Sequence, residues 1–525
     1  KTRRGLLRRK LDAVRATNRN VLVTYALVLA QGVAESVWGG TVLASYVYEL
    51  MGGSNAHAGY VEAASGLTNL IVALPVGWAA DKSSKSRIIA AGGVLIPFAA
   101  AATAFAVSYG AEHEDERQLC FNIFLAAMCA WGIVEAISNG PAQALFADSV
   151  PTGERSGAYT VLFALYLLSS TLGPLVCIFM FTLHGNRWHL RDLRNIFLAG
   201  MGFELISMFF MFSYRDSAAH HKSDDPPQAE SAVVVETAGG DAGPGGGGGG
   251  TGEGGDSGSD GHGGGGGGGS DSNSGTPSGS RFTWTVPYVM FTSSLAFALG
   301  SGMTVKFFPL FFKNSCRMSP VEVQAIYLAV PLVMALFSGV GTATAKRIGR
   351  AQTMTLLKVI GVSLLVSMAL LSDRWRLGAE HASADTTSLE FGQVAFLVSI
   401  YLIRTGLMNC TYPLEESILM DFVPSNTRAR WKSLDSIGIF GWCGSAAVGG
   451  YLADAYGYTF TFLITAYVQG AAVLAQATLI LIVPRTEGTE HAAAEREGAG
   501  VTPLRAAEAG ASLSGESVGT DTGGR

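Results

Sequence analysis

Long apolar segments alternate with short polar ones along most of the chain. Twelve of them are long enough to form bilayer-spanning helices, since such a helix needs about 20 mostly apolar residues. Six precede a long polar interval, at about 21–46, 58–80, 88–108, 120–146, 158–181 and 196–212. Six follow it, at about 284–312, 321–344, 353–371, 391–420, 433–453 and 460–483. The pattern predicts an all-α membrane protein with twelve transmembrane helices in two sets of six.

Polar segments flank and separate these two sets. The middle one contains the runs Gly245–Gly250 and Gly263–Gly269 among Ser, Asp and Glu, and offers no apolar surface to bury. We therefore expect five regions. These are a basic N-terminus (1–20), an N-terminal six-helix bundle (21–213), a disordered Gly-rich linker (214–282), a C-terminal six-helix bundle (283–484) and a disordered tail (485–525).

The composition agrees with a membrane protein. Only 15% of the residues are charged and the mean hydropathy is +0.31, whereas soluble domains carry about 25% charged residues. The net charge of -5 gives no reason to expect a nucleic-acid partner. The cysteines have no metal-ligand spacing, although a disulfide between Cys120 and Cys316 stays open.

Lysine and arginine gather in alternate loops. They lie in the N-terminus and in the loops after the second, eighth and tenth segments, around Lys85, Arg347 and Arg430. Because cytoplasmic loops of membrane proteins carry an excess of these residues, we expect those loops to be cytoplasmic. With an even number of spans, both termini and the linker then lie in the cytoplasm.

Two loop motifs occur once in each half. Asp148, Pro151 and Arg155 follow the fourth segment with the same D-x-x-P-x-x-x-R spacing that Asp421, Pro424 and Arg428 show after the tenth. The loops after the second and eighth segments read GWAADKSSKSR from residue 77 and GTATAKRIGR from residue 341. The two sets of helices are therefore predicted to be pseudo-repeats.

Two six-helix halves with these loops resemble the major facilitator superfamily, whose halves surround a midplane binding site. The stretch from residue 77 resembles the loop signature G-x-x-x-D-[RK]-x-G-[RK]-[RK] of that family, with Ser84 in place of the second glycine. Residues 408–432 are also similar to uncharacterised eukaryotic branches, which imply no particular cargo. The resemblance implies a secondary transporter without a cofactor, in which one chain supplies both halves. It also implies gating loops, with charge pairs among Asp81, Lys82, Lys85, Arg87, Asp148, Arg155, Lys346, Arg347, Asp421 and Arg428.

Four ionisable residues lie inside the apolar segments. They are Glu35, Glu135, Lys306 and Arg404, in the first, fourth, seventh and tenth segments, which line the central cavity in the resembled fold. A charge at bilayer depth costs about 2.5–3.5 kcal/mol, so it usually faces a cavity or a partner. Arg404 could hold a carboxylate or phosphate, while Glu35 or Glu135 could carry a proton.

Structural roles remain open for several of these charges. Lys306 could extend to the membrane interface instead of the cavity, and Glu135 could pair with a neighbouring helix. Glu204, Glu415 and Glu416 are expected to serve helix packing or closure of the cytoplasmic side.

The sequence thus favours a proton-coupled symporter in the bilayer that moves a small polar solute, which could be anionic, by alternating access. No phosphate loop or zinc-protease motif points to an enzyme. A receptor or sensor that keeps the fold without transport is the alternative. A scaffold for partner proteins is the third hypothesis.

Overall fold

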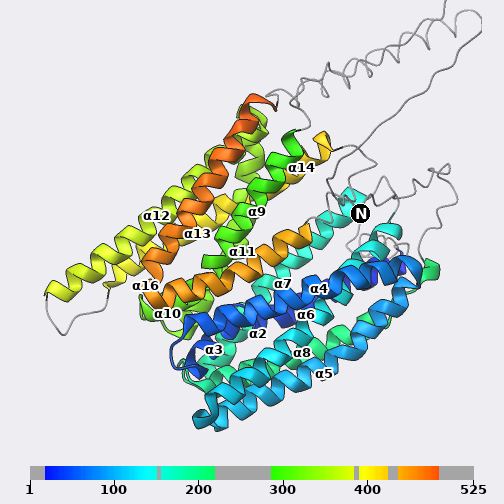
Figure 1. The fold of residues 1–525 in the computed structure, drawn as a ribbon, viewed down its shortest axis with the longest axis horizontal. Coiled ribbons are helices and arrows are strands. Elements are labelled where there is room, and N and C mark those ends of the chain that lie inside the picture. The colour runs from blue at the N-terminus through cyan, green and yellow to red at the C-terminus, as the bar shows by residue number, and fades with distance from the viewer. Residues whose placement is uncertain (1–17, 151–154, 219–284, 383–388, 424–434, 484–525) are drawn as a thin grey trace, which may run out of the picture. The chain divides into compact units, whose positions relative to one another are not determined.

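The computed structural model describes residues 18–150, 155–218, 285–382, 389–423 and 435–483, and these residues form helices and no strands (Figure 1). The expectations for most of the basic N-terminus, for most of the linker and for the whole tail lie outside these residues. We call the described residues before 219 the N-half and those after 284 the C-half.

The N-half contains seven α-helices and two short 3₁₀ turns. They are α2 (Arg19–Trp38), α3 (Thr41–Leu50), α4 (Asn55–Lys82), α5 (Lys85–Glu112), η1 (Glu114–Glu116), α6 (Arg117–Asp148), α7 (Arg155–His184), α8 (Leu190–Met211) and η2 (Asp216–Ala218). The C-half contains α9 (Thr285–Val305), α10 (Phe308–Asn314), α11 (Pro320–Ile348), α12 (Arg350–Ala382), α13 (Phe391–Asn409), α14 (Tyr412–Phe422), α16 (Asp435–Ala477) and η3 (Thr478–Leu481).

Eleven helical stretches of the described residues are long and apolar enough to cross a membrane. The last of them, Ile437–Leu481, is 45 residues long. It contains a kink at Gly457, whose φ of 82° lies in the left-handed region that glycine adopts without strain. Two helical segments therefore meet at Gly457.

Successive helices run up and down, so their turns gather at two opposite ends. One end holds the turns between Lys82 and Lys85 and between Ile348 and Arg350; we call it the basic end. The other, the far end, holds the turns at Gly52, Gly185, Ser315 and Gly457. At the far end, α11 starts with a capping box, in which Ser319 and Glu322 satisfy each other's backbone nitrogens.

The two halves are in close contact along α4 and α16. Gly59 and Gly66 of α4 face Ala446 and Cys443 of α16, and a Cβ atom at either glycine would overlap with the facing residue. Helices α7 and α11 form the second contact between the halves. Small residues at such positions let helices in a membrane pack closely.

All six cysteines are free, so the disulfide that the sequence left open between Cys120 and Cys316 does not form. The start of the expected linker also differs from expectation. Residues 214–218 lie on the N-half, where Tyr214 is buried and donates a hydrogen bond to Thr24 over 3.0 Å. The polar composition of the expected linker does not predict that its first residues pack against the helices before it.

Candidate functional site

A cavity of about 950 Å³ lies between the halves. Its wall runs from Phe308 toward the basic end, which it approaches at Leu419 and Ile439. Eight charged residues line it: Glu35, Glu62, Glu135 and Glu204 from the N-half, and Lys306, Lys358, Arg404 and Glu415 from the C-half. The structure thus places the four charges singled out in the sequence around one cavity.

Three of the lining spans are interrupted at the level of these charges. Helix α2 gives way to α3 at Gly39 and Gly40, four residues after Glu35. Helix α9 ends before Lys306, and α13 gives way to α14 at Cys410 and Thr411. Gly40 has a φ of 50°, which favours glycine. Interrupted helices leave backbone groups unpaired, and membrane proteins tolerate them where they line a cavity.

Three glutamates and one lysine form a cluster in this cavity. The Lys306 ammonium lies 2.9 Å from the Glu62 carboxylate, and Glu135 is hydrogen-bonded to Asn69. Glu35 is close enough to interact electrostatically with Glu62, Glu135 and Lys306. Lys306 therefore does not extend to the membrane interface, because it pairs with a carboxylate of the opposite half.

Arg404 lies on the wall formed by the C-half. Its side chain is buried, with 4% exposed, and the guanidinium lies 5.4 Å from the centre of the Phe308 ring. It donates one long hydrogen bond, 3.4 Å, to Gln469, while its Nε has no partner. Among the described residues no carboxylate pairs with this arginine. A buried cation without an anionic partner is costly, so the arrangement suits an anionic ligand.

Two carboxylates expected to serve packing or closure also line the cavity. Glu204 accepts hydrogen bonds from Trp38 Nε1 at 3.1 Å and from Ser207 at 3.3 Å. Glu415 lies 2.6 Å from the ammonium of Lys358. The side chain of Glu416 lies outside the described ones.

Sequence reasoning missed Glu62, Lys358 and Gln469. Glu62 and Lys358 each lie within an apolar segment, as the four predicted charges do, and the same rule applied to every span would have found them. Gln469 carries no charge. Its hydrogen bond with Arg404 in the structure is the observation that identifies it as part of the site.

Three of the predicted gating residues, Lys82, Lys85 and Asp148, have contacts in the structure, and these lie within the N-half. Lys85 forms an ion pair with Asp148 at 2.6 Å, both in the N-half, and Lys82 lies 4.2 Å from the centre of the Trp78 ring. Arg87, Lys346 and Arg347 are exposed. The side chains of Asp81, Arg155 and Asp421, and the whole of Arg428, lie outside the described ones. The Lys85–Asp148 pair therefore fastens α5 to α6 rather than one half to the other.

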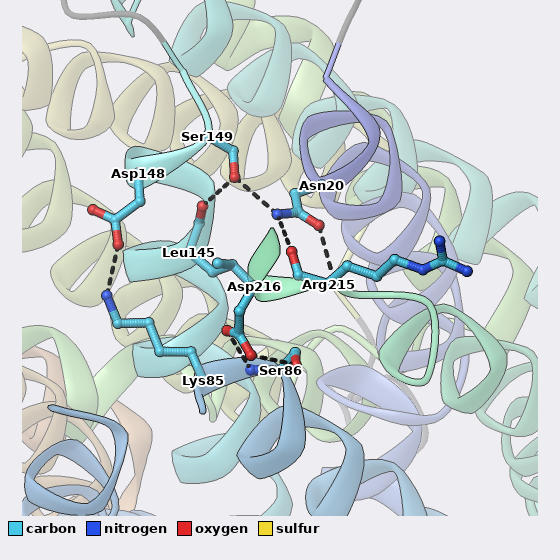
Figure 2. A network of polar contacts seen from close by, with 8 residues as sticks. All are labelled: Asn20, Lys85, Ser86, Leu145, Asp148, Ser149, Arg215 and Asp216. Carbon is cyan, nitrogen blue, oxygen red and sulfur yellow. Dashed lines mark hydrogen bonds and ion pairs between the residues drawn. The ribbon is translucent and has the colours of Figure 1, made fainter. Parts of the chain in front are cut away.

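The segment after α8 ties several helices together at the basic end (Figure 2). Asp216 accepts hydrogen bonds from the Ser86 backbone nitrogen at 3.1 Å and from the hydroxyls of Ser84 and Ser86, at the first turn of α5. Asn20 of α2 is bonded to both the carbonyl and the nitrogen of Arg215. Asn20 also donates a hydrogen bond to Ser149, 2.9 Å away. These contacts fix the point at which the chain leaves the N-half.

Polar contacts between the halves gather at the far end. Asp454 accepts hydrogen bonds from Ser54 and from the backbone nitrogens of Asn55 and Ala56. Lys313 and Glu49 form an ion pair. Three further hydrogen bonds join Trp188 to Met318, Asn186 to Val321 and Asn55 to Tyr458. The far end is therefore closed by direct bonds between the halves.

Within the described residues no group of three His, Cys, Asp or Glu side chains is placed to hold a metal ion. What the cavity offers is acidic carboxylates mainly from one half and an unpaired arginine from the other. Such a site can bind a charged solute and exchange protons.

Comparison with known proteins identifies the family of the chain. The family model described as Major Facilitator Superfamily matches residues 26–430. No curated protein matches the chain.

Several solved structures have a similar fold. A bacterial homologue of the iron transporter ferroportin, in an inward-facing state, is 12% identical with a TM-score of 0.60, over 88% of this chain and 98% of that one. A peptide transporter in complex with sulfate is 13% identical with a TM-score of 0.56, over 89% of this chain and 95% of that one. A nucleoside transporter is 14% identical with a TM-score of 0.55, over 88% of this chain and 99% of that one. At these identities the similarity shows the fold alone.

Proposed function

Because the chain belongs to the Major Facilitator Superfamily, we propose that it moves a small polar solute that carries an anionic group through its cavity by alternating access, coupled to protons. The family consists of membrane transporters. The chain is accordingly an integral, multi-pass membrane transporter and not an enzyme. The solute, its charge and the coupling ion belong to our proposal.

The proposal includes twelve spans in two pseudo-repeats. Helix α16 has 43 residues, which at 1.5 Å per residue is about 65 Å, roughly twice the thickness of the hydrocarbon core. Counting the segments on either side of Gly457 as separate spans turns eleven into twelve, six in each half. The basic end then faces the cytoplasm, because the short basic loops lie there.

The observation that supports an anionic group on the solute is Arg404. It is the one basic residue among the described cavity residues that has no carboxylate partner. Its guanidinium can donate two parallel hydrogen bonds to a carboxylate or phosphate. The guanidinium also lies within cation–π distance of the Phe308 ring.

Direct bonds at the far end and a cavity that extends toward the basic end support an inward-facing state. In the proposed cycle the far-end bonds break and the halves rock about the contact between α4 and α16. The solute would then exchange between Arg404 and the other side of the membrane.

An untargeted uptake screen tests transport. Cells expressing the wild-type chain, Arg404→Ala or Arg194→Ala at matched surface levels are compared with empty-vector cells. We expect particular solutes to accumulate with wild type and with Arg194→Ala, whose arginine lies at the far end beside Glu112, but not with Arg404→Ala. Equal profiles in all cells would favour the sensor or the scaffold.

Proton coupling is assigned to the carboxylates around Lys306. Protonation of Glu62 or Glu135 would weaken the electrostatic attraction between that carboxylate and the Lys306 ammonium. Because Lys306 belongs to the opposite half, binding of a proton would then weaken the contact between the halves. We expect Glu135→Gln to lose accumulation driven by a pH gradient while still exchanging labelled solute. Unchanged accumulation in Glu135→Gln would contradict this role.

A further inference from the structure

The cavity holds two charges of opposite sign that the protein leaves unmatched. Four of the eight charged lining residues form ion pairs, Glu62 with Lys306 and Glu415 with Lys358, and two further carboxylates are hydrogen-bonded, Glu204 to Trp38 and Glu135 to Asn69. The remaining two are Glu35 and Arg404, and the one hydrogen bond of Arg404, to Gln469, is long at 3.4 Å. Among the described residues, neither forms an ion pair.

Glu35 is the unmatched acid. Its side chain is exposed to the cavity, and the one ammonium near it, that of Lys306, is bonded to Glu62 instead. Helix α2 is interrupted four residues later, at Gly39 and Gly40, which line the same cavity. A cation that enters the cavity can therefore reach Glu35 without displacing a protein group.

The unmatched base, Arg404, belongs to the other half and lies on the same cavity. The two positions are connected through α9 and α10. Lys306 belongs to the acidic cluster, and Phe308, two residues later, lies under the Arg404 guanidinium. A molecule long enough to span the cavity between these two positions can therefore face both charges.

Each unmatched charge has aromatic rings beside it. Trp38, three residues after Glu35, lies 5.5 Å from Trp131 between ring centres. Phe308, beside Arg404, lies 4.7 Å from Tyr401. Apolar walls with a few fixed polar groups are typical of small-molecule sites. The rings can enclose the body of a solute whose two ends carry charges.

We propose that the solute is a zwitterion, with an amine that pairs with Glu35 and a carboxylate or phosphate that pairs with Arg404. This rests on the proposed transport function and names its substrate class. A simple anion would satisfy Arg404 but add negative charge to a cavity in which Glu35 is already unmatched. An amine alone would leave Arg404 buried without a partner, which is costly. A zwitterion compensates both charges and bridges the two halves.

Uptake of a metabolite mixture tests the charge class directly. The purified full-length chain in liposomes is incubated with a protein-free extract of small metabolites, and the vesicle contents are measured by mass spectrometry against protein-free liposomes. Wild type is expected to enrich molecules that carry both an amine and an acidic group. The spectra also separate amino carboxylates from amino phosphates.

Three variants assign the two ends. Glu35→Gln and Arg404→Gln are each expected to lower enrichment about thirtyfold or more, the size typical of removing one partner from a desolvated charge pair. Glu35→Asp keeps the charge and should restore part of the uptake, which loss of folding would not allow. Glu112→Gln, at an exposed carboxylate of the far end, is the matched control and should behave as wild type.

Enrichment of molecules with only one kind of charge would overturn the zwitterion while leaving transport intact. So would a Glu35→Gln variant that enriches zwitterions as well as wild type does. If wild type enriches no molecule over protein-free liposomes, the proposed transport function fails, and the inference fails with it.

Discussion

Asp454 of α16 accepts hydrogen bonds from both the backbone nitrogen and the side-chain nitrogen of Asn55, each at 2.8 Å. Asn55 is the first residue of α4, and Ser54 forms no capping bond to its own helix. The start of a helix leaves backbone N–H groups unpaired and attracts negative charge. A residue of the C-half thus caps a helix of the N-half.

Removing this cap should favour opening of the far end. A lost N-cap costs about 0.5–2 kcal/mol, so Asp454→Ala is expected to raise the open population by about twofold to thirtyfold. Cys443, which lines the cavity, reports the change. With the other cysteines replaced, its labelling by a membrane-impermeant thiol reagent from the far side should be faster.

Ser319→Ala is the matched control, because Ser319 caps α11 within the C-half. It should leave the labelling rate of Cys443 unchanged. Equal rates in Asp454→Ala and its parent would show that this cap does not hold the far end closed.

The ion pair between Lys306 and Glu62 should couple the stabilities of the two halves. Lys306→Met and Glu62→Gln each leave one charge in the cavity without its partner, whereas the double variant leaves neither. Thermal unfolding in detergent should show a coupling free energy of about 0.5–3 kcal/mol. The exposed pair of Arg194 and Glu112 serves as the comparison, and its coupling free energy should be less than about 1 kcal/mol. If the losses of stability in Lys306→Met and Glu62→Gln simply add in the double variant, the contact between the two side chains contributes nothing to stability.

The contact of Asp216 with α5 should weaken in acid. Burial alone would raise the pKa of Asp216, but hydrogen bonds from Ser84 and Ser86 outweigh it and lower that pKa. The stabilisation is then complete above the ordinary pKa of about 3.9 and disappears as the pH falls through the lower value in the folded protein. Hydrogen exchange of the Ser86 amide should accelerate in this range in wild type.

In Asp216→Asn the exchange of the Ser86 amide should not accelerate in this pH range, because the variant has no carboxylate to protonate. After correction for the intrinsic rate, identical pH profiles in wild type and Asp216→Asn would contradict the assignment.

Much of the fold follows from hydrophobic length, because each spanning helix must bury about 20 apolar residues in lipid. The segments at 88–108 and 196–212, for example, correspond to α5 and α8. The interruption at Lys306 was not predicted, because an apolar run looks the same whether or not its helix is broken. The left-handed Gly457 could not be distinguished from other glycines for the same reason.

Part of the cavity was also predictable. Rules for charges in membranes singled out Glu35 and Arg404, and both line the cavity. Which charges pair depends on contacts between distant residues, so the sequence left open whether Lys306 faces the cavity and gave no sign that it binds Glu62. Their positions are separated by more than two hundred residues and meet only when the halves pack.

Linking the halves across the far end tests alternating access most directly. Glu49 and Lys313 form an ion pair there, so cysteines at these two positions, in a chain whose native cysteines are replaced, can be joined through disulfides by a short bis-methanethiosulfonate cross-linker. We predict that the cross-linked chain binds solute but loses uptake, and that reduction of the cross-link restores uptake. Treatment with the cross-linker should leave the uptake of each single-cysteine variant unchanged. Undiminished uptake by the fully cross-linked chain would contradict the account, because solute would then cross the membrane while the far end stays closed.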